Sequence, residues 1–124
     1  ILGTGGASKA IKQVLIDLSI PFKVVSRKEG FDFTYEELNS KSEILEDFQL
    51  IINTTPLGTY PKVEEKPDLP YKALTENHYL YDLVYNPSET AFIKAGATQG
   101  AKTLNGLEML IGQAEKSWEI WNRS

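Results

Sequence analysis

Apolar residues near the start of the chain change from a helical to an extended spacing. Between residues 10 and 18 they recur every three or four positions, which predicts a helix with one buried stripe. The predicted stripe consists of Ala10, Ile11, Val14, Leu15 and Leu18. Ser19–Pro21 ends this helix, and the β-branched and aromatic residues at 22–26 predict a parallel strand buried on both faces. Because a glycine-rich turn precedes the helix, the pattern predicts a right-handed βαβ unit.

The same alternation of strands and helices continues to the end of the chain. Thr34 and Glu37 have the spacing of a capping box, which predicts a short helix ahead of Leu38. Further predicted elements are strands at 48–53, 79–85 and 102–104, a helix at 90–99 with Gly100 at its C-cap, and a last amphipathic helix at 107–121. We therefore expect an α/β fold: a Rossmann-like, doubly wound, mostly parallel sheet in three αβα layers.

Composition limits the function classes. A hydrophobic fraction of 41% with 24% charged residues over 124 residues is typical of one folded domain and not of a disordered chain. The net charge of −4 argues against nucleic-acid binding. The sequence has no cysteine, shows no metal-binding constellation, and lacks the run of ~20 apolar residues that a membrane span requires. These features favour a cytoplasmic protein.

The glycine-rich turn is the first candidate site. Gly3, Gly5 and Gly6 lie between a strand and a helix, where backbone amides at a helix N-terminus bind pyrophosphate. The alternative is that these glycines only turn the chain from strand to helix. One position departs from the dinucleotide fingerprint, since Ser8 stands where the third glycine or alanine is expected.

The end of the next predicted strand carries positive charge. An NAD site places a carboxylate there to hold the ribose hydroxyl, whereas this chain has Ser26, Arg27 and Lys28. A guanidinium can pair with a 2′-phosphate through two hydrogen bonds, so this turn favours NADP over NAD. The alternative is an ordinary turn with two solvated cations.

Other polar residues give weaker signals. Asp82, Tyr85 and Gln113 could face a crevice that holds the hydroxyl and carboxylate groups of a substrate, although packing and solvation are the commoner roles of a strand-end tyrosine and a helical glutamine. His78 stands in a polar context and is predicted to lie at the surface. Trp118 and Trp121 share one helical face and are predicted to pack rather than to stack on a ligand.

Four motifs together resemble one family. They read GTGGAS from Gly3, INTTPLG from Ile52, YDLVYNP from Tyr81 and NGLEMLIGQA from Asn105. In this order they resemble the C-terminal NADP-binding domain of the shikimate dehydrogenases. The resemblance implies reversible hydride transfer between NADPH and 3-dehydroshikimate, which gives shikimate on the pathway to chorismate and the aromatic amino acids.

The resemblance also implies roles for individual residues. The pyrophosphate would be held by Gly3, Thr4, Gly5, Gly6 and Ala7, and the adenosine phosphate by Ser26, Arg27 and Lys28. The nicotinamide side would be formed by Leu83 and Gly106, the rest of the cofactor channel by Thr54, Thr55 and Met109, and the substrate contacts by Tyr85 and Gln113. Two departures affect cofactor contacts: Gly30-Phe31 stands near a place where the family has a further basic residue, and Thr59 replaces a common methionine.

The catalytic residues are expected to lie outside this chain. Only Ile1 and Leu2 precede the glycine turn, so the chain is expected to begin inside a strand, as residues 1–124 of a two-domain enzyme without its N-terminal substrate domain. The family places its catalytic lysine and aspartate in that domain. We therefore expect no catalytic residue here and no turnover by this chain alone.

Two alternatives stay open. A relative that acts on quinate or a similar cyclic acid would present the same motifs. A nucleotide-binding module that regulates without catalysis would need only the glycine turn and the strand-end cations. The sequence leaves the oligomeric state open.

Overall fold

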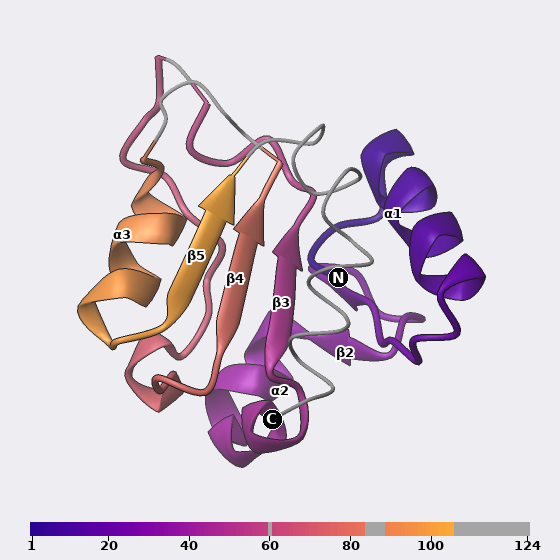
Figure 1. The fold of residues 1–124 in the computed structure, drawn as a ribbon, viewed down its shortest axis with the longest axis horizontal. Helices are drawn as coiled ribbons and strands as arrows, with labels where there is room; N and C mark the ends of the chain where they lie inside the picture. The colour runs from indigo at the N-terminus through magenta and orange to yellow at the C-terminus, as the bar shows by residue number, and fades with distance from the viewer. Residues whose placement is uncertain (60, 84–88, 106–124) are drawn as a thin grey trace.

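The computed structural model describes residues 1–59, 61–83 and 89–105 (Figure 1). Its elements follow in the order α1 (Gly6–Asp17), β1 (Val25–Ser26), β2 (Phe33–Thr34), α2 (Tyr35–Ser40), η1 (Ser42–Asp47), β3 (Leu50–Asn53), η2 (Tyr71–Ala73), β4 (Tyr79–Asp82), α3 (Ala91–Thr98) and β5 (Lys102–Asn105). The predicted helix at 107–121, with Trp118 and Trp121, lies outside the described residues. No helix in the described ranges is long and apolar enough to cross a membrane.

All described strand pairs are parallel. β2 pairs with β1, and β3, β4 and β5 form a second group in that order. Leu2 joins the two groups because it bridges Val25 on one side and Asn53 on the other. The spatial order is therefore β2, β1, Leu2, β3, β4, β5, and Figure 1 shows β3, β4 and β5 pointing toward one edge.

Helices cover both faces of this sheet. Successive strand residues point to opposite faces, and the two buried clusters divide accordingly. Ile51 of β3 belongs to the cluster that contains Phe92 of α3, whereas the next residue, Ile52, belongs to the cluster that contains Ile11 of α1. The structure thus confirms the predicted Rossmann-like α/β fold, with a parallel sheet between helices.

The first two predicted helices form where the periodicity and the capping box place them. α1 buries Ile11 and Leu15, although Ala10, which the pattern assigned to the buried stripe, is exposed. The predicted capping box begins α2: the Thr34 side chain accepts from the Glu37 amide, and the Glu37 side chain accepts from the Thr34 amide.

The end of α3 differs slightly from the prediction. Thr90 is its N-cap and Gln99 its C-cap, so Gly100 follows the cap instead of forming it. Gly100 adopts φ +87°, and the Ala101 amide donates to the Gly96 carbonyl at 3.1 Å. This left-handed residue closes the helix as glycine usually does.

The strand after α1 is shorter than predicted. It begins at Val25 and not at residue 22, because the Val24 amide donates to Asp32 Oδ2 at 2.7 Å instead of joining a ladder. Phe33–Thr34 forms an additional parallel strand beside it, which the sequence did not predict. β3 likewise starts at Leu50 rather than residue 48, and the short helices η1 and η2 were also not predicted.

Candidate functional site

The carboxyl ends of parallel strands meet at one edge of the sheet. At this edge the structure brings together the glycine turn after Leu2, the Ser26–Lys28 turn after β1, Thr54 and Thr55 after β3, and Leu83 after β4. These segments carry most of the predicted cofactor residues. The edge is where open α/β sheets bind ligands.

The glycine turn and the turn after β3 come closest together at Gly3. Its φ is +105°, and a Cβ at this position would lie 2.8 Å from Thr54 Oγ1 and 3.0 Å from Thr55 Cγ2. A side chain here would therefore meet both backbone strain and a steric clash. The glycine turn and the Thr54–Thr55 turn are packed directly against each other.

The beginning of α1 is open. Gly5 is the N-cap without a side-chain cap, the first turn contains no acidic residue, and a Cβ at Gly5 or Gly6 would meet nothing within 4 Å. The first amides of a helix lack intrahelical partners, and the helix dipole adds positive potential there. Thr4, Gly5, Gly6 and Ala7 are exposed, so an anion can reach this turn.

Two threonines after β3, Thr54 and Thr55, pack against the glycine turn and are fixed by hydrogen bonds. The Thr54 hydroxyl donates to the Leu2 carbonyl at 2.5 Å, and the Thr54 amide donates to the same oxygen at 3.0 Å. The Thr55 hydroxyl donates to Asn53 Oδ1 at 2.7 Å. Both threonines are half-buried, so they lie between the glycine turn and the interior.

Beneath these threonines lies a buried polar group that the sequence interpretation did not identify as a unit. Asp82 is 1% exposed, accepts from Asn53 Nδ2 at 3.1 Å, and accepts from the Thr90 hydroxyl at 2.5 Å. The prediction that Asp82 faces a substrate crevice is therefore wrong. Polar residues at the ends of two buried strands were the available signal, but their partners lie too far apart in sequence to be paired by pattern.

The Arg27 side chain lies at the outer part of the edge. Ser26 is buried and its hydroxyl accepts from the Lys28 amide at 3.1 Å, whereas Arg27 and Lys28 are exposed. The structure shows no ion pair between Arg27 and another described residue. The guanidinium is thus free of carboxylate partners within the described part of the chain.

A groove of about 610 Å³ separates the Arg27 turn from α2. Its lining carries both signs of charge, with Arg27 and Lys41 among the cations and Glu29, Glu36 and Glu37 among the anions. Tyr35, which is buried, also lines this groove. Burial raises the Tyr35 pKa to about 12, the nearby Arg27 charge opposes this rise, and Asp68 adds to it. The groove has room for an adenosine moiety beside Arg27.

Comparison with known proteins decides the family. No family model matches the chain. It is 44% identical to the shikimate dehydrogenase (NADP(+)) of Clostridium beijerinckii over an alignment of 132 positions, which covers 98% of this chain and 47% of the relative. The chain belongs to the shikimate dehydrogenase family. It spans about half the length of the curated relatives it matches.

Solved shikimate dehydrogenases share its fold. Shikimate dehydrogenase 1 from Peptoclostridium difficile matches with a TM-score of 0.64 and 42% identity, over 99% of this chain and 46% of that one. The enzyme from Thermus thermophilus, solved in complex with NADP(H) and shikimate, matches with a TM-score of 0.69 and 26% identity, over 99% and 48%.

The Ser8 departure from the dinucleotide fingerprint is accommodated locally. The Ser8 side chain is fully buried, and its hydroxyl donates to the Gly5 carbonyl at 2.6 Å. A small residue thus fills the position below the turn, and its one donor is satisfied inside the turn itself. This shikimate dehydrogenase homologue therefore keeps a compact glycine turn without the third glycine.

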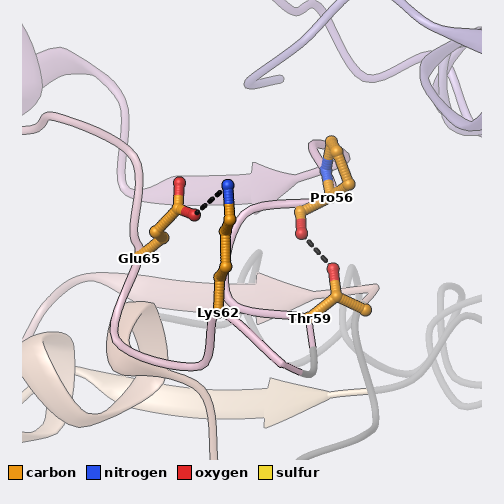
Figure 2. Close-up of polar contacts among 4 residues, drawn as sticks. All are labelled: Pro56, Thr59, Lys62 and Glu65. Carbon is orange, nitrogen blue, oxygen red and sulfur yellow. Dashed lines mark hydrogen bonds and ion pairs between the residues drawn. The ribbon is translucent and has the colours of Figure 1, made fainter.

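Thr59 is the second position at which the motif resemblance indicated a departure. It is exposed, and its hydroxyl donates to the Pro56 carbonyl within one turn (Figure 2). Farther along the same segment, Lys62 Nζ lies 4.0 Å from Glu65 Oε1, with 77% and 40% of these side chains exposed. Such an exposed ion pair contributes little stability. The hydrogen bond to the Pro56 carbonyl indicates that the Thr59 side chain stabilises its own turn.

His78 is the clearest error of the sequence interpretation. It was predicted at the surface but is 4% exposed, before β4 and at the edge opposite the glycine turn. Its Nδ1 accepts from the Thr75 amide at 3.0 Å, so Nε2 carries the proton that reaches the Leu45 carbonyl at 2.8 Å. This histidine has a structural role.

Four predicted site residues are not placed. Tyr85, Gly106, Met109 and Gln113 lie outside the described residues, so their predicted contacts with nicotinamide, the cofactor channel and substrate stay predictions. Within the described residues, no group of three or more possible ligands lies close enough to hold a metal ion.

Proposed function

We propose that this chain is the dinucleotide-binding domain of an NADP-dependent shikimate dehydrogenase. The observation that carries the proposal is the joint position, at one sheet edge, of an open glycine turn and an Arg27 without an ion pair to described residues, in a chain related to these enzymes over 98% of its length. The glycine turn would bind the pyrophosphate of NADP, and Arg27 would bind its 2′-phosphate.

The proposed contacts follow the edge of the sheet. Gly3, Thr4, Gly5, Gly6 and Ala7 would bind the pyrophosphate, and Ser26, Arg27 and Lys28 the adenosine end with its 2′-phosphate. Thr54, Thr55 and Leu83, with Gly106 and Met109, would line the remaining channel. Tyr85 and Gln113 would contact the cyclic substrate.

The chemistry divides between cofactor and protein. NADPH, when bound, supplies the hydride that reduces 3-dehydroshikimate to shikimate. This chain would bind the cofactor, orient it and exclude water from the strand ends. The catalytic lysine and aspartate would come from a separate substrate domain in the cytoplasmic enzyme, so we expect the chain alone to bind but not to turn over.

Titration calorimetry with NADP+ and with NAD+ tests the proposal on this chain. We expect NADP+ to bind more tightly, and Arg27→Ala to remove most of that preference, about tenfold or more, because a charge-assisted contact to the 2′-phosphate is lost. Lys23→Ala is the matched control, since it removes a cation from the opposite end of β1. Equal affinity for the two dinucleotides, or no loss in Arg27→Ala, would reject the assignment.

A further inference from the structure

A chain of buried side chains connects the ends of β3 and β4 to the start of α3. Asn53, Asp82 and Thr90 are each no more than 1% exposed. Asp82 Oδ1 accepts from Asn53 Nδ2 at 3.1 Å, and Asp82 Oδ2 accepts from Thr90 Oγ1 at 2.5 Å. Thr90 Oγ1 also accepts from the Ile93 amide at 3.3 Å. We refer to these three residues as the Asn53–Asp82–Thr90 network.

The network determines which way the Asn53 amide points. Because both Asp82 oxygens act as acceptors, Asn53 turns its NH2 group toward Asp82 and its carbonyl oxygen away from it. That oxygen accepts from the Thr55 amide at 3.0 Å and from the Thr55 hydroxyl at 2.7 Å. The Thr55 hydroxyl oxygen in turn accepts from the Leu57 amide at 3.3 Å.

The same residue also holds the start of the next loop. The Leu83 amide donates to the Asn53 carbonyl at 3.2 Å. Asn53 thus fixes Thr55 through its side chain and Leu83 through its backbone. Thr55 in turn packs against Gly3. Asp82 is therefore connected to the glycine turn through two side chains, those of Asn53 and Thr55.

We propose that Asp82 is a positioning residue for dinucleotide binding. Through the Asn53 side chain it holds Thr55 against the Gly3 backbone. It contacts no cofactor itself, since it is buried below these residues. The inference rests on the proposed function for its ligand, but its structural step is testable without any ligand.

Swapping the residue types of Asn53 and Asp82 tests whether the hydrogen-bond pattern or the residue at each position matters. In Asp82→Asn, the new NH2 group faces either the Asn53 NH2 or the Thr90 hydroxyl, and each choice leaves one donor without an acceptor. In the double variant Asn53→Asp with Asp82→Asn, the new amide donates to the new carboxylate and accepts from Thr90, and the carboxylate still accepts from Thr55. Charge and size are conserved.

Hydrogen exchange on the ligand-free full chain tests the structural step. In Asp82→Asn we expect the Thr55 and Leu57 amides to exchange about tenfold faster, because their acceptors are no longer held, whereas the double variant returns to within about threefold of the parent chain. Leu74→Val is the control, because it removes one buried methylene at the opposite edge and leaves the network intact. If Asp82→Asn does not fold, Thr90→Val replaces it, since it removes the Oδ2 partner together with the acceptor of the Ile93 amide and leaves Asp82 and Asn53 in place.

NADP+ titration of the same variants tests the functional step. We expect Asp82→Asn to raise Kd about tenfold, the double variant to restore it, and Leu74→Val to leave it unchanged. Unchanged exchange at Thr55 and Leu57 in Asp82→Asn, or a double variant no better than Asp82→Asn, would overturn the inference. If the parent chain binds no NADP+, the proposed function fails, while the exchange data still decide whether Asp82 positions the turn.

Discussion

The central and outer parts of the same sheet edge are built in different ways. At the centre, Gly3 packs against two threonines, which rest on a buried and hydrogen-bonded network. At the outer end, Arg27 and Lys28 extend into solvent without ion pairs to described residues. The centre is specified by shape and hydrogen-bond direction, whereas the outer end is specified by charge alone.

This difference separates affinity from selectivity. The centre has its geometry before any ligand arrives, so binding there costs little ordering. The outer end must order long side chains around a phosphate, and salt screens its attraction. We therefore expect changes at the centre to affect folding and binding together, and changes at the outer end to affect only the choice between dinucleotides.

The largest expected effect comes from Gly3→Ala. Backbone strain at φ +105° and the approach to Thr54 Oγ1 should lower the free energy of unfolding by ~3 kcal/mol. Gly6→Ala is the control in the same turn, because a Cβ there meets nothing within 4 Å, and it should be neutral or stabilising by up to ~1 kcal/mol. Urea unfolding measures both. Equal costs for the two variants would show that the centre is not sterically defined.

Thr90→Val tests the network through the helix cap. It removes the hydroxyl that donates to Asp82 and accepts from Ile93, and should cost ~2 kcal/mol of unfolding free energy. Thr98→Val, in the same helix, removes an exposed hydroxyl that donates to the Lys94 carbonyl, and should cost less than ~0.5 kcal/mol. Thermal unfolding of the pair would contradict this account if the two shifts were alike.

Tyr35, which lines the groove between the Arg27 turn and α2, should make the free energy of unfolding depend on pH. Its pKa is raised to about 12 in the folded protein, against 10.0 for the ordinary phenol. The neutral Tyr35 phenol therefore makes its full contribution to the free energy of unfolding below pH 10. As the pH rises through 12 this contribution is lost, which lowers the free energy of unfolding by on the order of 1 kcal/mol or more. Tyr35→Phe should show a smaller loss of unfolding free energy between about pH 9 and pH 11.5. An identical pH dependence would show that Tyr35 does not titrate with folding.

The smallest expected effect on stability is that of Arg27→Ala. Because the side chain is exposed, the free energy of unfolding should change by less than ~0.5 kcal/mol. Its contribution to NADP+ binding should shrink as salt rises from about 0.05 to 0.5 M, since the Debye length falls severalfold. Calorimetry at two salt concentrations measures this. A large loss of stability would mean that Arg27 belongs to the structural centre.

Local sequence signals led to reliable predictions. The capping box at Thr34 and the periodicity of α1 depend on residues within one or two turns, and the structure confirms both. The parallel order of strands also followed from their alternation with helices. Four motifs in order were sufficient to predict the family.

The errors arose where a partner outside the residue's own helix or strand decides the outcome. His78 can be buried because its Nε2–H group donates a hydrogen bond to the Leu45 carbonyl, 33 residues away. β1 is short because Asp32 takes the Val24 amide. Asp82 turns inward because Asn53, 29 residues away, and Thr90 donate to it. A single sequence does not reveal such pairings, and motif resemblance assigned cofactor roles without showing what supports them.

Leu2 has a consequence for how the molecule folds. One residue joins two groups of strands whose bridges reach Val25 and Asn53, so the sheet becomes continuous only after segments about 20 and 50 residues apart have met. Contacts of such long sequence separation form late and slow the folding of small domains. The Leu2–Asn53 bridge joins residues that are farther apart in sequence than any pair within the β3–β5 ladders. We therefore expect this bridge to gain protection after the β3–β5 ladders, so that the glycine turn reaches its final place against β3 late in folding.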